Sequence, residues 1–308
     1  NISIGDKGDD PCFTITDLLP HLAKDQMKAN ANEFIDPEKM NILFGSIKDK
    51  EAKDNKVKAT VLKLLNEKYG IKEIDFARSD IEFVPAFAAK YIGIDKSMIG
   101  GYGQDDRVCA YATLRAMIDA VKEEKEISTT MVAMIVDKEE IGSYGNTSMS
   151  TEAFDMFINK IIEKTGSTSV DKLELYYNSS MLSADVTAGV NPNYEEVSDT
   201  QNANLIGCGV AVEKYGGARG KSGGSEANAE FVSKVMNIFD KSKVQYQLGT
   251  LGKVERGGGG TIAFILANKG VDVVDCGTPV LSMHSPFEVT SKFDVYMTYL
   301  SYKAFFKE

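Results

Sequence analysis

The chain has 308 residues, of which 43% are hydrophobic and 26% are charged, as in an ordinary globular protein. Its formal net charge of −10 argues against a nucleic-acid-binding surface, and no apolar run approaches the roughly 20 residues that cross a membrane. Cys12, Cys109, Cys208 and Cys276 form no C-x-x-C pair, which excludes zinc ribbons and redox motifs and fits free thiols in the cytoplasm. With only two histidines, a metal centre would depend mostly on carboxylates.

The first hundred residues differ in pattern from the rest. Residues 24–55 are polar and irregular, and residues 57–69 place apolar side chains at helical spacing before Gly70, which suits a C-terminal cap. Residues 71–87 alternate between apolar and charged types, which predicts one or two half-exposed strands. A glycine-rich turn follows at residues 100–103, and we place a domain boundary there, dividing the chain into residues 1–100 and 101–308.

After the boundary the pattern alternates between helix and strand. The predicted helices are residues 107–122, 151–164, 225–239, 261–268 and 288–306. The predicted strands are residues 129–136, 173–180, 205–212, 244–248 and 271–275. In the first helix we expect Val108, Ala112, Leu114, Ile118 and Val121 on the buried side. This alternation predicts an α/β fold with a mostly parallel sheet flanked by helices.

An acidic pair stands where the apolar run at residues 131–136 ends. Glu139 and Glu140 lie in the stretch DKEEIGS at residues 137–143. Adjacent carboxylates repel each other, so a site that holds them needs a cation or a proton between them. In an open α/β sheet, ligands bind at the carboxyl ends of strands. The pair therefore indicates a metal site with one carboxylate beside the attacking water; the alternative is a solvated loop.

Further candidate ligands stand at similar loop positions. Asp105 and Asp106 begin a helix, while Asp185 and His284 each follow a strand. Each has a simpler interpretation, as a helix cap, a turn residue or a core histidine. Together they form a plausible set for two metal ions, because zinc accepts aspartate, glutamate and histidine ligands. Paired metals are a known device of hydrolases.

The chain resembles the aspartyl aminopeptidase and aminopeptidase I family of dizinc metallo-aminopeptidases, most closely the bacterial branch like aminopeptidase I. The motifs that carry this resemblance span nearly the whole chain. They are DDP at 9–11, FTI at 13–15, LLPHLA at 18–23, GQDDR at 103–107, DKEEIGS at 137–143, SAD at 183–185, NPNY at 191–194, GGGGT at 257–261 and MHS at 283–285.

The resemblance implies a role for each site residue. Asp105 would bridge two divalent metals, most readily zinc with cobalt or manganese as alternatives, and would precede Asp106 across a peptide bond that is often cis. Glu140 and His284 would complete one metal's shell, and Asp185 would bind the other metal. Glu139 would be the general base acting on the bridging water, which attacks the first peptide bond.

One departure from the family pattern concerns the second metal. The family also uses a histidine from a His-Thr-Asp-type motif upstream of the segment at residues 9–11, and this chain has no such histidine. We interpret the chain as lacking the N-terminal part of the catalytic domain, which would carry that ligand. The alternative is a non-catalytic or metal-deficient assembly protein of the same family.

The resemblance also implies the fold and the assembly. The fold would be of the zinc exopeptidase type, with residues 1–100 as an inserted dimerisation domain and dimers building a tetrahedral dodecamer. His21 would reach the substrate pocket of the neighbouring subunit, with a helix-start histidine as the alternative, and Lys214 and Lys221 are further candidates for contact with substrate. The preferred N-terminal residue, neutral or acidic, stays open. A carboxypeptidase or deacylase of the same superfamily is the rival enzyme.

Overall fold

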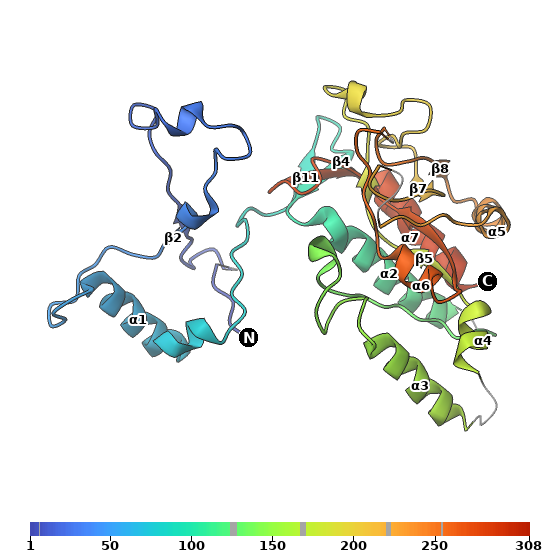
Figure 1. Cartoon of the computed structure of the whole chain (residues 1–308), viewed down its shortest axis with the longest axis horizontal. Helices are drawn as coiled ribbons and strands as arrows, with labels where there is room; N and C mark the ends of the chain where they lie inside the picture. Colours follow the sequence, from blue (N-terminus) through green and yellow to red (C-terminus); the bar gives the residue numbers. More distant parts are fainter. Residues whose placement is uncertain (6, 124–127, 167–170, 220–222, 254) are drawn as a thin grey trace. The chain divides into compact units, whose positions relative to one another are not determined.

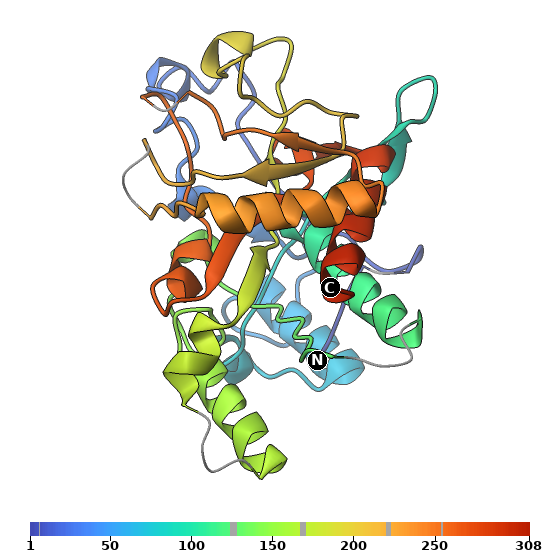
Figure 2. The same cartoon turned by 90° about the vertical axis from the view of Figure 1, so that its right-hand side faces the viewer.

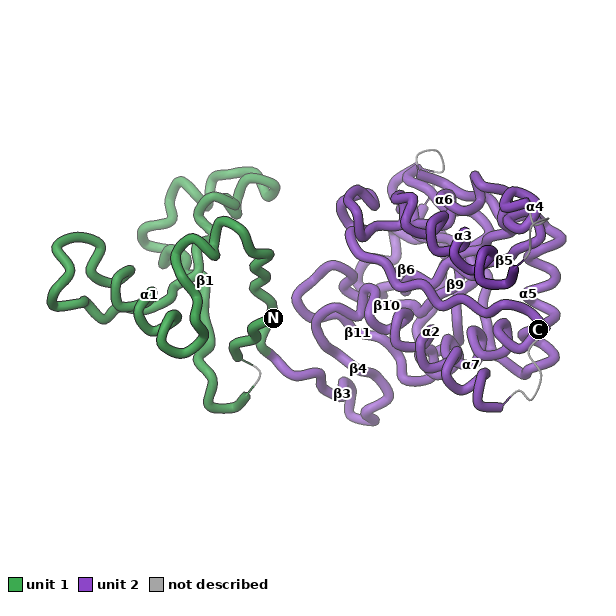
Figure 3. Tube along the Cα trace, turned by 90° about the horizontal axis from the view of Figure 1, so that it is seen from below, with its two compact units in different colours: residues 1–86 green, residues 87–308 purple. Residues whose placement is uncertain are grey.

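The structure is a computed structural model, and it describes residues 1–5, 7–123, 128–166, 171–219, 223–253 and 255–308. The chain divides into two compact units, residues 1–86 and residues 87–308 (Figure 3). The division falls at Ala86 and Phe87, earlier than the predicted boundary at residue 100. The reason is that β3 (Lys90–Ile92) and β4 (Met98–Gly101) pair into a sheet with β11 (Glu288–Ser291).

Residues 1–86 contain little regular structure. β1 (Thr14–Ile15) and β2 (Ile42–Leu43) form a short antiparallel pair, and α1 (Lys56–Tyr69) confirms the predicted helix with its cap at Gly70, where φ is 74°. The strands predicted over residues 71–87 are wrong. Glu73–Ala77 is a 3-10 helix, and residues 71–89 make no strand pairing, because alternation alone supplies no partner strand.

Residues 87–308 hold two sheets and most of the helices (Figure 1). The helices are α2 (Gln104–Glu123), α3 (Ala153–Thr165), α4 (Lys172–Tyr177), α5 (Ala229–Lys241), α6 (Ala263–Ala267) and α7 (Lys292–Phe306). The remaining strands are β5 (Ser180–Ser183), β6 (Thr187–Ala188), β7 (Val210–Glu213), β8 (Tyr246–Leu248), β9 (Asp272–Gly277) and β10 (Pro279–Leu281).

Both sheets are mixed. One has the order β5-β9-β7-β8, with parallel pairs β5–β9 and β7–β8 joined by the antiparallel pair β7–β9. The other has the order β3-β4-β11-β10-β6, in which only β10–β6 is parallel among the described strands. The α/β class is confirmed, but the pairing is less parallel than the helix–strand alternation predicted, because β10 and β11 follow β9 without an intervening helix.

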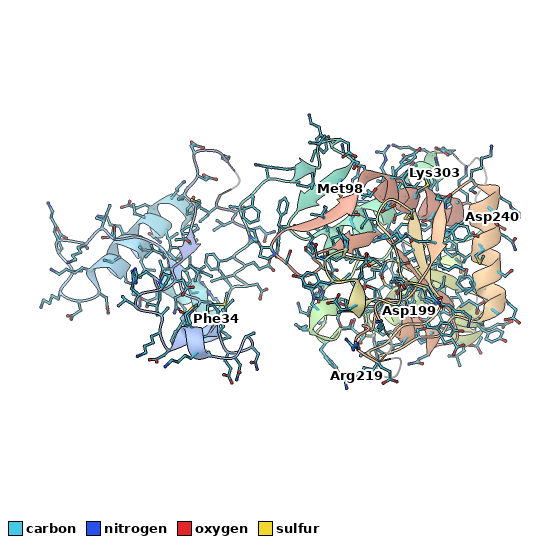
Figure 4. The ribbon with its side chains drawn as sticks, turned by 90° about the horizontal axis from the view of Figure 1, so that it is seen from above. Phe34, Met98, Asp199, Arg219, Asp240 and Lys303 are labelled. Carbon is cyan, nitrogen blue, oxygen red and sulfur yellow. The ribbon has the colours of Figure 1, made fainter. Side chains whose placement is uncertain are left out.

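Helices cover both faces of the sheet that contains β9. Val274 and Cys276 face a buried cluster built with α2, α5 and α7, whereas Val273 faces a second cluster built with α3, α4 and α6. Successive side chains of a strand point to opposite faces, so the apolar run of β9 is explained by burial on both sides. Figure 2 shows α5, in orange, lying across this sheet, and Asp240 near its end points to the outside (Figure 4).

The buried side of α2 consists of small residues. Val108 and Ala112 are buried as predicted, together with Cys109, Ala116 and Ala120. The prediction for Leu114, Ile118 and Val121 is wrong, because these side chains are 49%, 39% and 47% exposed. The packing of α2 against α7 explains the difference, since small side chains let two helix backbones approach closely.

Two predicted strands are not strands. Residues 131–136 have no assigned strand, although Met134 and Val136 pack against the second buried cluster. Residues 172–177 form α4, because the side chain of Asp171 accepts a hydrogen bond from the Leu173 amide at 2.8 Å and starts a helix. Among the described residues, no helix combines the length and apolar composition needed to cross a membrane.

Candidate metal centre

The predicted metal ligands and the predicted base converge on one cavity of about 350 Å³. They arrive from four segments: Asp105 from the start of α2, Glu139 and Glu140 from the 3-10 helix η4 (Glu139–Ile141), Asp185 from the loop after β5, and His284 from the loop after β10. The loop at residues 258–261 also lines the cavity.

The first group of candidate ligands is Asp105, Glu140 and His284. Nε2 of His284 lies 3.0 Å from Oδ2 of Asp105 and 3.3 Å from Oε1 of Glu140. Burial, followed by the charge of Glu140, raises the pKa of Asp105 to about 6. Two carboxylates and an imidazole at this separation form a donor set that zinc accepts.

The second group is Asp105, Asp106 and Asp185, whose nearest oxygens all lie within 4.8 Å of one another. Burial raises the pKa of Asp106 to about 8 and is also the main cause of a raised pKa at Asp185, where Asp106 adds to it. Within the described residues, Oδ1 of Asp106 is buried without a hydrogen-bond partner. Three crowded carboxylates with an unpartnered oxygen fit a cation.

Asp105 belongs to both groups, as expected of a ligand that bridges two ions. The peptide bond between Asp105 and Asp106 is cis, as the resemblance implied. The family resemblance assigned no metal to Asp106, and its place beside Asp185 comes from the structure.

Glu139 lines the same cavity but belongs to neither group of ligands. Burial, with the neighbouring charge of Glu140, raises the pKa of its carboxyl. A carboxylate that borders the ligands, is not needed as one, and has a raised proton affinity is suited to general-base work.

The buried residue Glu288 on β11 accepts hydrogen bonds from the backbone of two candidate ligands, and the sequence analysis did not identify it. Its Oε1 accepts a hydrogen bond from the His284 amide at 2.7 Å, and its Oε2 accepts one from the Asp105 amide at 3.0 Å. Glu288 is 2% exposed. One carboxylate therefore fixes the backbone at ligands that are far apart in the sequence.

The position of Asp185 depends on a glycine across the sheet. A Cβ on Gly277, in β9, would lie 1.6 Å from the backbone oxygen of Asp185. Because that space has no room for a side chain, position 277 must be glycine for β9 to lie this close to the loop that carries Asp185.

The structure places the three candidates for substrate contact differently. His21 lies exposed in residues 1–86. Lys214 forms an ion pair with Glu226 at 3.2 Å and is not among the residues that line the cavity. Lys221 lies outside the described residues. The role of each in substrate binding stays a prediction.

This donor set, with an adjacent carboxylate free to act as a base, defines a metallohydrolase site in an α/β fold. Residues 1–306 match the family described as Aminopeptidase I zinc metalloprotease (M18), and the chain belongs to that family of zinc metallo-aminopeptidases.

Relatives of known sequence and structure agree. The chain is 46% identical over 311 residues to the probable M18 family aminopeptidase 1 of Borrelia garinii subsp. bavariensis, covering 100% of this chain and 67% of the relative. It superposes on an M18 family aminopeptidase from Thermotoga maritima with a TM-score of 0.94 and 44% identity, covering 99% of this chain and 67% of that one. The chain thus spans about two thirds of the length of these relatives.

A more distant protein shares the fold alone. The S. cerevisiae mApe1, solved as a dodecamer, is 22% identical with a TM-score of 0.67, over 88% of this chain and 60% of that one.

Proposed function

We propose that this chain forms the hydrolytic site of a two-metal aminopeptidase that removes single residues from the free N-terminus of peptides. The observation that carries the proposal is the convergence of Asp105, Glu140, Asp185 and His284 on the cavity that also contains Glu139. The alternative of a non-catalytic assembly protein gains no support, because family membership and a complete first ligand group both favour an enzyme.

Each residue has a distinct role in this proposal. Asp105, Glu140 and His284 would hold one zinc ion, and Asp105 with Asp185 would hold a second, next to Asp106. The bound ions would polarise the peptide carbonyl and stabilise negative charge on its oxygen. Glu139 takes a proton from the attacking water and returns it to the amine that leaves. The raised pKa of Glu139 makes the carboxylate a stronger proton acceptor.

Substitution of the base tests the proposal. In Glu139→Gln we expect kcat/KM on a dipeptide to fall by roughly 10²- to 10⁴-fold while the bound metal content is unchanged. Glu163→Gln, which removes an exposed carboxylate from α3, is the matched control and should keep full activity. Full activity in Glu139→Gln would show that the base is elsewhere.

A blocked substrate separates the rival enzyme class. An aminopeptidase requires a free amino terminus, so an N-acetylated dipeptide should resist cleavage at the substrate concentration that gives rapid cleavage of the free form. Cleavage of the acetylated peptide would favour a deacylase or carboxypeptidase of the same superfamily.

The number and identity of the ions need their own measurement. We expect titration of zinc, cobalt or manganese into the stripped protein to show a tighter site that contains His284 and a weaker one built from the carboxylates of Asp105, Asp106 and Asp185. His284→Ala should remove the tighter site. If substitution of Asp105 removes both sites while substitution of His284 removes only one, the result would support Asp105 as a ligand shared by the two ions.

Assembly is proposed from the surface of residues 1–86. Large apolar side chains there are exposed in the single chain, which is typical of an interaction surface. We propose that this unit serves dimerisation, that dimers assemble into a dodecamer in the cytoplasm, and that His21 reaches a neighbouring pocket. Sedimentation of the purified protein tests the assembly. The reach of His21 across subunits is tested separately: His21→Ala should lower kcat, and kcat should be restored in oligomers that also contain unaltered subunits.

A further inference from the structure

Glu139 and Glu140 share one short loop. We name residues 137–148, which carry both side chains, the carboxylate loop. The amide of Asp137 donates a hydrogen bond to the Thr147 carbonyl at 3.1 Å and so joins the two ends of this loop. The proposed base and one proposed metal ligand are therefore held in a segment that is closed at its neck.

Ser148 attaches the carboxylate loop to the packed interior. Its hydroxyl donates to the carbonyl of Ser143 and to that of Gly145, the latter at 2.8 Å. A serine hydroxyl has a single hydrogen, so the two carbonyl oxygens share one donor and are held close to each other. Ser148 is 4% exposed, and the next residue, Met149, belongs to the second buried cluster. One buried hydroxyl therefore gathers the loop against the core.

Ser143 connects Ser148 to the start of η4. The amide of Ser143 donates to the Lys138 carbonyl at 2.9 Å, and the amide of Gly142 donates to the Glu139 carbonyl at 2.8 Å. Lys138 and Ser143 have left-handed backbones, with φ of 67° and 59°. Residues other than glycine keep this conformation where surrounding contacts hold them in it. The backbone that carries the two carboxylates is thus fixed through Ser143.

The two carboxylates differ in their other contacts. Oε1 of Glu140 lies 3.3 Å from Nε2 of His284, and a bound metal would hold this carboxylate further. The carboxyl of Glu139 is influenced by burial and by neighbouring charges, but it has no hydrogen-bond partner among the residues that the structure describes. The direction of Glu139 therefore depends on the backbone of the carboxylate loop, and a displacement of the loop would affect the base before the ligand.

We propose that Ser148 is a positioning residue for the reaction, whose hydroxyl holds the carboxylate loop so that Glu139 faces the attacking water. The proposal rests on the aminopeptidase function above. Without the hydroxyl, the carbonyls of Ser143 and Gly145 would lose their shared donor and would separate to find other partners. Because a general base must lie within hydrogen-bond reach of the proton that it takes, a small movement of the loop would slow proton transfer.

The first test compares serine variants of the metal-loaded protein. In Ser148→Ala we expect kcat on leucine anilide to fall about 10-fold, because the base is misplaced, with KM and bound metal content unchanged. Ser179→Ala is the matched control and should keep full activity. The Ser179 hydroxyl also donates to a backbone carbonyl, that of Leu175 at 2.7 Å, and Ser179 does not line the cavity. An unchanged kcat in Ser148→Ala, or a parallel loss of metal, would overturn the proposal.

A double variant shows whether Ser148 acts through the base. If its hydroxyl serves to orient Glu139, Ser148→Ala should have no further effect on kcat in a chain that already carries Glu139→Gln. A further loss of about 10-fold in the double variant would contradict the proposal, because independent effects multiply in the rate. Ser148 would then be assigned to the general stability of the fold.

Amide hydrogen exchange of the metal-free protein supplies a readout without catalysis. Relative to Ser179→Ala, Ser148→Ala should speed exchange at the amides of Gly142 and Ser143 by about 10-fold, since both are hydrogen-bonded within the carboxylate loop. Unchanged exchange there, or an equal rise throughout the chain, would refute the proposal. If exchange at these two amides responds but the unaltered protein cleaves no peptide, the aminopeptidase function fails while the hold of Ser148 on the loop stands.

Discussion

In residues 87–308, helices and strands close two buried apolar clusters, whereas in residues 1–86 only Ala23 and Leu65 are buried apolar residues among those described. The smaller unit exposes large side chains such as Leu22 and Ile47, at 68% and 71%. The rings of Phe13, Phe44 and Phe83 lie next to one another in this unit.

The difference separates two tasks. A set of ligands must be held by a rigid framework, and the two clusters of the larger unit supply it. A surface that is buried only on association needs apolar groups that the single chain leaves open, and residues 1–86 supply those. We therefore expect substitutions in residues 87–308 to change stability and metal affinity, and substitutions in residues 1–86 to change self-association.

The largest contrast in stability should come from a matched pair of truncations. Phe239→Ala removes a ring that is 0% exposed in the first cluster and should lower the free energy of unfolding by about 3–5 kcal/mol. Leu22→Ala should change it by no more than about 0.5 kcal/mol in a dissociated chain. Chemical denaturation at low protein concentration gives both values. Equal losses would mean that residues 1–86 have a core that depends on Leu22.

The next contrast lies in metal affinity. Glu288→Gln replaces one of the two oxygens that accept the amides of His284 and Asp105 with an amide group that cannot accept them. We expect metal affinity to fall roughly 10- to 100-fold, measured by competition with a chelator. Glu38→Gln, in residues 1–86, is the exposed control and should bind metal normally. Unchanged affinity in Glu288→Gln would show that the two backbones are held in place without it.

Association should respond to the smaller unit alone. Leu22→Asp places a charge on the exposed apolar surface of residues 1–86 and should weaken self-association about 10-fold or more, since a buried unpaired charge is costly at an interface. Sedimentation velocity across a dilution series measures this. Ile118→Asp, on the exposed side of α2, is the comparison within the larger unit. Assembly that survives Leu22→Asp but not Ile118→Asp would move the interface to residues 87–308.

The smallest expected effect concerns acid stability. Asp155 on α3 is a partly buried acceptor for Lys172, Lys269 and Tyr176. Although burial raises its pKa, the hydrogen bonds from Lys172 and Lys269 outweigh that effect and lower it to about 2. Because the folded pKa is below the unfolded one, its stabilisation is present above about pH 4 and is lost as the pH falls towards 2.

Asp155→Asn should therefore be less stable than the unaltered protein by about 1–2 kcal/mol at neutral pH, and the difference should shrink in acid. Thermal melting as a function of pH measures it. Asp75→Asn removes the carboxylate that pairs with the exposed Arg78 in residues 1–86 and should change the profile much less, because water screens that pair. A pH-independent loss in Asp155→Asn would assign its role to packing.

The sequence was informative where chemistry is concentrated in a short stretch. Glu139, Glu140 and the pair at Asp105 were identified because adjacent carboxylates need a cation, and the structure brings them to one cavity with Asp185 and His284. The helix α1 and its cap at Gly70 were also predicted, since local spacing and a positive φ are local properties.

The remainder depended on partners distant in the sequence. Glu288 is a single acid between Phe287 and Val289, and its role arises only when β11 meets the segments that carry Asp105 and His284. Residues 131–136 are apolar enough for a strand, but a strand also requires a neighbour, and none is assigned to them. Leu114 was expected on the buried side of its helix, whereas the close approach of α7 selects small residues there.

The closeness of Gly277 to Asp185 has a consequence for how this protein tolerates change. Position 277 carries no donor, acceptor or charge in its side chain, yet any larger residue there would push the Asp185 backbone away. In a survey of all single substitutions scored by metal retention, this position should therefore be as intolerant as a ligand, although it takes no part in the chemistry. The sensitive positions would then include those where the backbone is tightly packed around the ions, as well as the residues that bind the ions.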